Sequence, residues 1–194
     1  MKNKWTVLTL LTLALATACA PQAVTPAATT AAPQTAAPIP TTETSPAEAF
    51  ELYLLADADA RGADLLEVPV DDLALAETPL LTTADLTHCD RETHTLTLTG
   101  NGFQKVTDLL SDNFQVAGIP FVIVAKGERI YAGAFWTPLS SQSFDGVVIM
   151  DPAFTEDKSI QISLGYPGSD FFTGADPRDD ARLMDALDEV GILN

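Results

Sequence analysis

Basic residues are scarce in this sequence. Its 194 residues include 27 Asp and Glu but only 10 Lys and Arg, which gives a formal net charge of -17 at pH 7. Such a chain repels nucleic-acid backbones and anionic lipid headgroups. We therefore expect no nucleic-acid partner, and we expect the folded part to stand away from a membrane surface.

Long apolar runs are also absent. The longest candidate is the stretch at 7–18, which is shorter than the roughly 20 residues that a spanning helix needs. It follows Lys2 and Lys4, and a positively charged N-terminal region before a short apolar stretch is typical of a secretory signal peptide, here called the leader. We therefore predict a cleaved leader over 1–18 and no transmembrane helix.

The leader ends in the letters ATAC at residues 16–19, which resemble a bacterial lipobox. In such a motif the cysteine, here Cys19, receives acyl chains such as palmitate and becomes the new N-terminus. This predicts a lipoprotein of the bacterial cell envelope, anchored to the membrane by its lipid alone. Ala20, rather than an acidic residue, after the cysteine favours the outer membrane if the host has one. The alternative is plain secretion after cleavage at an A-x-A-like site.

Cysteine is nearly missing, because the chain holds only Cys19 and Cys89. If Cys19 carries lipid, Cys89 has no disulfide partner, and no C-x-x-C pair exists for redox chemistry or zinc. We expect Cys89 to be a small buried apolar residue and the protein to need no cofactor.

Aromatic residues are missing from 20–45, which consist almost entirely of Ala, Thr, Pro and Gln. Such a segment buries too little apolar surface to offset its chain entropy. We therefore divide the chain into a leader at 1–18, a lipidated cysteine and tether at 19–45, and one globular domain at 46–194.

Hydrophobic periodicity within the domain predicts an α+β fold. Strand patterns occur at 49–57 and 92–100, and in two hairpins, 119–136 and 145–167. Helical stripes occur at 101–113, with Asn101 as cap, and at 176–190, with Asp176 as cap and Gly191 as stop. The predicted architecture is a mostly antiparallel sheet of five or six strands packed with two main helices.

Residues 79–150 resemble the head part of the first periplasmic domain of SecD, a membrane component that assists bacterial protein export. The resemblance is carried by turn and apolar positions: Thr82, Asp85, Leu96, Leu98, Gly102, Phe103, Leu109, Gly127 and Tyr131. It implies strands backed by helices and a role in contacting proteins. It transfers no catalytic residue, and the helices that couple SecD to proton movement are not predicted here. The chain is also similar to uncharacterised bacterial lipoproteins that share the hairpin GIPFV…GERIY.GAFW.

Residues suited to catalysis are few. Ser140, Ser141 and Ser143 are not in a G-x-S-x-G elbow, and no Ser–His–acid arrangement is visible around His88 or His94. If 88–94 were extended, His88, Asp90 and His94 would share one face as metal ligands. The alternative function is therefore an extracytoplasmic hydrolase or metal-binding enzyme that uses His88 and His94.

The segment at 57–68 partly matches the sequence pattern of a calcium-binding loop. Asp57, Asp59 and Gly62 fall at positions 1, 3 and 6 of the EF-hand pattern. However, Arg61 stands where an oxygen ligand belongs, and Glu67 is one residue short of position 12. We favour a solvated acidic loop.

The stretch Gly133–Gly146 concentrates aromatic and serine residues. We expect a strand with core aromatics that ends at Pro138. The alternative is that Trp136 and Phe144 lie exposed together as a contact site for a protein partner. The sequence as a whole predicts a lipid-anchored extracytoplasmic domain without enzymatic activity, in a protein-binding or envelope-associated role.

Overall fold

The computed structural model describes residues 48–154 and 158–194, which fall within one unit of the chain. The predicted leader at 1–18, the lipidation site Cys19 and the tether at 19–45 lie outside the described residues. The predicted domain at 46–194 is described apart from two residues at its start and three internal ones.

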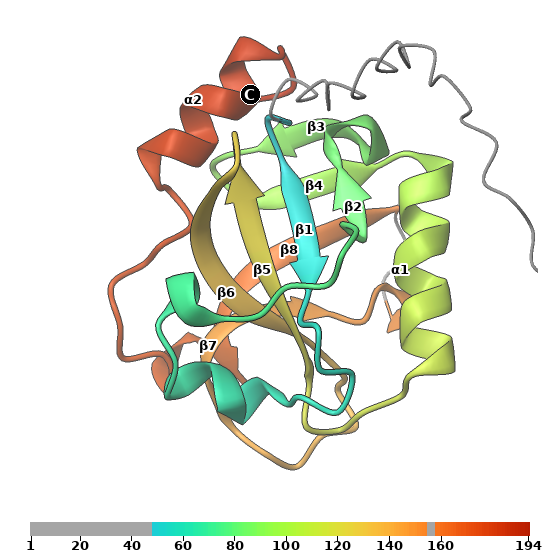
Figure 1. Cartoon of the computed structure of the whole chain (residues 1–194). Coiled ribbons are helices and arrows are strands. Elements are labelled where there is room, and N and C mark those ends of the chain that lie inside the picture. Colours follow the sequence, from blue (N-terminus) through green and yellow to red (C-terminus); the bar gives the residue numbers. More distant parts are fainter. Residues whose placement is uncertain (1–47, 155–157) are drawn as a thin grey trace, which may run out of the picture. The chain divides into compact units, whose positions relative to one another are not determined.

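Eight strands form one curled sheet, in the order β2-β1-β5-β6-β7-β8-β4-β3 (Figure 1). The strands are β1 (Glu51–Leu54), β2 (Leu81–Thr82), β3 (Leu86–Asp90), β4 (Thr95–Leu98), β5 (Ile119–Ala125), β6 (Glu128–Trp136), β7 (Phe144–Met150) and β8 (Ser159–Tyr166). Neighbouring strands are antiparallel except β6 and β7, which are parallel.

The prediction of a mostly antiparallel sheet of five or six strands, like the SecD head, is wrong. The sheet is mixed and has eight strands, with β3 among those that the sequence did not predict. A register shift between Leu86 and His88 interrupts the pairing of β3 with β4, so the period-two pattern of β3 is lost. The parallel pair arises because residues 137–143 return the chain along β6 before β7 begins.

Both predicted hairpins form. β5 and β6 pair around a turn in which Lys126 and Gly127 both have positive φ, of 49° and 81°. Glycine adopts such a conformation without the steric cost of a Cβ atom. β7 and β8 pair antiparallel on either side of the undescribed residues 155–157.

Two α-helices are present among the described residues, α1 (Gly100–Asp112) and α2 (Ala181–Glu189). Short 3-10 turns add η1 (Gly62–Leu66), η2 (Val70–Asp72), η3 (Thr83–Asp85), η4 (Pro152–Phe154) and η5 (Ser169–Phe171). Along α2, Leu183, Met184 and Leu187 are buried, whereas Val190, which follows the last helical residue, is exposed.

The helix caps differ from the predicted ones. Thr99, not Asn101, caps α1 by accepting a hydrogen bond from the Gly102 amide. Asp180, not Asp176, caps α2 by accepting one from the Arg182 amide. More than one side-chain acceptor lies near each helix start, and the tertiary structure decides which of them is the cap.

Apolar residues pack against both faces of the sheet. One face packs with α1 and α2 in the main core, which includes Phe50, Phe121, Phe135, Ile149 and Leu187. Segment 56–80 crosses β5 and β6 on the other face (Figure 1). There Leu73 packs on Val122 and Val124, and Leu65 packs on the Trp136 cluster. The acidic segment therefore forms a cover for the sheet.

Irregular segments of the chain add hydrogen bonds beside β1 and β3. Beside β1, the amides of Ala56 and Leu80 bond to the carbonyls of Ala74 and Leu52. Beside β3, the C-terminal residues pair with Cys89, whose amide donates to the Ile192 carbonyl.

Within the described ranges, we find no helix whose length and hydropathy would allow it to cross a membrane.

Candidate functional site

Trp136 and Phe144 are buried together rather than exposed together. Each is only 3% exposed, and their rings stack 5.0 Å apart at an interplanar angle of 12°. Tyr166 adds a third ring, 5.6 Å from that of Trp136. The two side chains therefore offer no surface to a partner in this structure.

Two glycines allow the chain to close over Trp136. A Cβ atom on Gly118 would lie 2.3 Å from the indole ring, and one on Gly62 would lie 2.8 Å from it. Gly118 also has a φ of +78°, which favours glycine. The Gly62 amide donates to the Ala117 carbonyl at 3.0 Å, which joins the two segments above the ring.

Exposed apolar side chains gather instead at one end of the sheet, which we call the loop end. It comprises segments 55–62, 113–118 and 137–143, at the lower end of β1 and β5 in Figure 1. Leu139, Phe114 and Val116 are 65%, 57% and 43% exposed. Leu139 and Phe114 are the two most exposed large apolar residues in the described part of the chain.

Hydrogen bonds hold the loops of this end together. The Ser140 hydroxyl donates to the Val116 carbonyl at 2.6 Å and accepts from the Gln142 amide. The Tyr166 hydroxyl donates to the Ser140 carbonyl at 3.2 Å. Ser140 is buried, and its hydroxyl connects the segments 113–118 and 137–143.

An apolar pocket opens between the loop end and α1. Its volume is about 240 Å³, and it lies between the end of β1, the last turn of α1 and the start of β5. Eight of its eleven lining residues are apolar, and the three polar ones are Asp57, Asn113 and Gln115. We call it the loop-end pocket. Gln115, which lies between Phe114 and Val116 in the chain, and Ile119 also line a smaller cavity together with Phe114, so the loop-end pocket is next to exposed apolar residues.

The two histidines do not form a catalytic arrangement in the described residues. His88 is on β3, whereas His94 ends the β3–β4 turn with a φ of 50°, so the segment 88–94 is not extended. No hydrogen bond joins either imidazole to a serine in the described part of the chain. That part also holds no group of three or more His, Cys, Asp or Glu suited to a metal.

The carboxylates of the acidic loop cap local turns. Asp57 accepts from the Asp59 amide at 3.0 Å, and Asp64 accepts from the Arg61 amide at 2.8 Å. Residues 62–66 form η1, so the positions of a calcium loop are not brought around a common centre.

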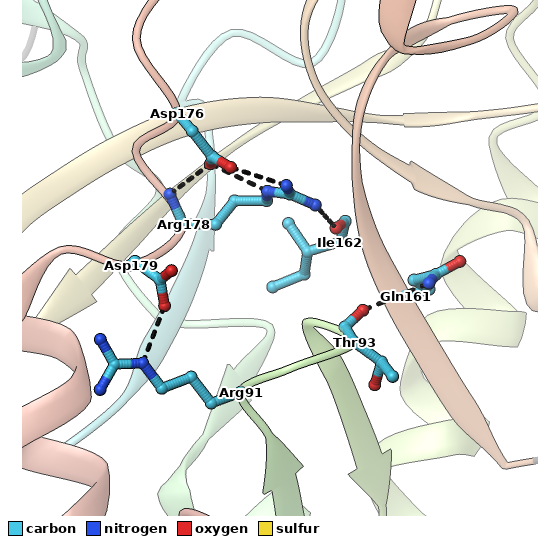
Figure 2. Close-up of polar contacts among 7 residues, drawn as sticks. All are labelled: Arg91, Thr93, Gln161, Ile162, Asp176, Arg178 and Asp179. Carbon is cyan, nitrogen blue, oxygen red and sulfur yellow. Dashed lines mark hydrogen bonds and ion pairs between the residues drawn. The ribbon is translucent and has the colours of Figure 1, made fainter.

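Figure 2 shows a second polar cluster, which fixes the segment before α2 to the sheet. Arg178 forms a forked pair with Asp176 at 2.7 and 2.9 Å and donates to the Ile162 carbonyl at 2.9 Å. Arg91 pairs with Asp179 at 3.0 Å. Carboxylates of the chain thus already pair with both guanidinium groups, and the cluster has a structural role.

A cavity of about 10 Å³ lies beneath this cluster and is lined by Cys89 and Tyr131. That volume suits a single water molecule. Burial raises the pKa of the Cys89 thiol to about 11, and the nearby Asp90 carboxylate adds to this effect. Burial also raises the pKa of Tyr131. Both groups are therefore neutral at physiological pH, and Cys89 lacks the thiolate character of a reactive cysteine.

Comparisons with known proteins add no assignment: no family model, curated protein or solved structure matches the chain. The resemblance to SecD accordingly stays a hypothesis drawn from the sequence.

Sequence reasoning missed Phe114, Val116 and Leu139. The available signal was the presence of apolar residues in segments that lie between predicted elements. Such residues in a loop are either buried by the fold or exposed, and only the structure distinguishes the two outcomes.

Proposed function

We propose that this protein is a lipid-anchored, extracytoplasmic domain without enzymatic activity that binds a protein partner through its loop end. The anchor, the envelope location and the absence of catalysis are inferred from the sequence. The observation that supports partner binding is the exposure of Leu139, Phe114 and Val116 on loops that are hydrogen-bonded to one another. Apolar side chains gathered on a surface commonly mark a protein contact.

The position of the loop end is consistent with this proposal. The described chain starts at Glu48, whose carbonyl accepts a hydrogen bond from the Lys126 amide at the opposite end of β5. The seven residues of β5 separate the two ends by roughly 20 Å, at about 3.3 Å per residue. A lipid-anchored protein of this kind would present the loop end away from the attachment of its tether.

Site-specific photo-crosslinking in native membranes tests the proposal. A photoreactive phenylalanine analogue replaces Leu139 in the full chain, and the matched control replaces Val190, which is 47% exposed. Val190 follows Glu189, which pairs with Lys126 at the other end of the sheet. We expect one discrete protein adduct from position 139, none from position 190, and a weaker adduct when Phe114→Ser is added.

Two results would contradict the proposal. One is the absence of any adduct from position 139, and the other is the same set of adducts from both positions.

A further inference from the structure

The loop-end pocket has the size of a single large side chain. Its volume of about 240 Å³ is below the roughly 300–1,000 Å³ of pockets that hold drug-sized ligands. A cavity of about 150 Å³ already accepts a benzene ring. The pocket therefore suits one aromatic or long aliphatic group better than a whole cofactor.

The lining of the pocket favours an apolar group at its floor. Leu54, Leu109 and Ile119 come from β1, α1 and β5, and these elements are packed into the main core. Ala58, Ala60 and Ala76 contribute only methyl groups, which leaves the space unfilled. A large apolar side chain would remove this surface from water without any change in the sheet.

The charge at the rim indicates what flanks that group. Among the described residues that line the pocket, Asp57 alone is charged, and the exposed Asp59 follows it closely in the chain. With a net charge of -17 for the chain, a ligand with a carboxylate beside its apolar group would be repelled. A ligand with an amine or guanidinium there would be attracted.

We infer that the loop-end pocket receives one large apolar side chain of a protein partner, flanked in that partner by a basic residue. This inference rests on the proposed function, because the exposed Phe114 and Val116 beside the pocket provide the contact surface around it. A buried anchor in a pocket surrounded by weaker contacts is the usual arrangement of a protein interface.

Short capped peptides test this inference on the full chain in detergent, with the methyl resonances of Ala58, Ala60 and Ala76 as the readout. The probes are N-acetyl-Phe-Lys-amide, N-acetyl-Phe-Glu-amide and N-acetyl-Ala-Lys-amide. We expect the Phe-Lys probe to shift these resonances with a dissociation constant on the order of 1 mM. The Phe-Glu probe should bind about fivefold more weakly, and the Ala-Lys probe should cause no saturable shift.

Three variants separate the effects of shape and charge. Ala76→Leu partly fills the pocket and should weaken binding of Phe-Lys by about tenfold or more. Ala181→Leu adds the same atoms at an exposed position on α2 and should leave the binding of Phe-Lys unchanged. Asp57→Asn removes the negative charge and should make the affinities of the Phe-Lys and Phe-Glu probes equal. The local turn should be kept, since the amide oxygen can still accept from the Asp59 amide.

The inference is overturned if the Phe-Lys probe shifts the alanine methyls no more than Ala-Lys does, or if its binding survives Ala76→Leu. If crosslinking from Leu139 succeeds while the peptides fail, the inference fails and the proposed function stands. If the peptides bind but position 139 yields no adduct, the proposed function fails, and with it the assignment to a protein partner.

Discussion

At the scale of single residues, the structure confirms the expected core position of Trp136 and places an exposed side chain just after Pro138. Trp136, just before the proline, lies under the backbones of Gly62 and Gly118. Leu139, just after it, is the most exposed large apolar side chain of the described residues. Three positions therefore separate a core residue from an exposed one, so substitutions at the two sites should affect different properties.

Trp136→Ala should lower the free energy of unfolding by about 3–5 kcal/mol, because it removes a large buried side chain. The total free energy of unfolding of such a domain is roughly 5–15 kcal/mol. Urea unfolding followed by circular dichroism measures the loss. In a Trp5→Phe background Trp136 is the only tryptophan, and its emission should be blue-shifted and poorly quenched by iodide.

Phe114→Ala is the matched control, because Phe114 is also aromatic but largely exposed. It should change the free energy of unfolding by about 0.5 kcal/mol or less. Native Trp136 emission that is already red-shifted and easily quenched would show that the ring is not buried.

At the scale of elements, Asp85 joins the start of α1 to the turn between β2 and β3. Its carboxylate accepts from the Thr82 amide at 3.0 Å, from Asn101 Nδ2 at 3.0 Å and from Lys105 Nζ at 2.7 Å. Burial by itself would raise the pKa of Asp85. The hydrogen bonds from Lys105, Thr82 and Asn101 outweigh burial, so the pKa of this carboxyl is lowered. The sequence singled out this residue only as one position of the resemblance to SecD.

Asp85→Ala should lower the free energy of unfolding by about 2–4 kcal/mol at pH 7, because it leaves three donors without their acceptor. Since the pKa is lower in the folded state, the carboxylate stabilises the fold above the unfolded pKa of about 3.9. That contribution is lost as the pH falls from there through the folded pKa. Urea unfolding at a series of pH values should therefore show the difference between wild type and Asp85→Ala shrinking in acid.

Asp112→Ala serves as the control at the other end of α1, where the residue is exposed. At pH 7 this substitution should change the free energy of unfolding by about 0.5 kcal/mol or less. A difference between wild type and Asp85→Ala that stays constant down to pH 2 would contradict the assigned role of Asp85.

At the scale of the whole molecule, the proposed anchor and the proposed contact surface belong to different parts of the chain. Cys19→Ser should move the protein from the membrane fraction to the soluble fraction and remove acyl labelling. Fractionation and labelling with an alkyne-tagged fatty acid measure the two effects. The purified Cys19→Ser protein should unfold at the same urea concentration as wild type, since the folded domain is unchanged. Membrane association that persists without acylation would contradict the lipoprotein assignment.

The sequence alone was sufficient to predict those elements that are specified by neighbouring residues. The turn at Lys126-Gly127 pairs a glycine with flanking apolar strands, and the stripe of Val106 and its neighbours has the period of a helix. Both form as predicted. Local signals also predicted the burial of Cys89 and the stop of α2 near Gly191, which has a φ of +73°.

Only the tertiary structure decided the features that depend on contacts between distant segments. The parallel pairing of β6 with β7 depends on the path of residues 137–143, which no periodicity records. The burial of Trp136 depends on Gly62 and Gly118, which are respectively 74 and 18 positions away in the chain. The loop-end pocket likewise needs β1, α1 and β5 to meet at one end of the sheet. Side-chain exposure depends on such contacts between distant segments. The sequence favoured a core position for Trp136, but only the structure shows that Leu139 faces solvent.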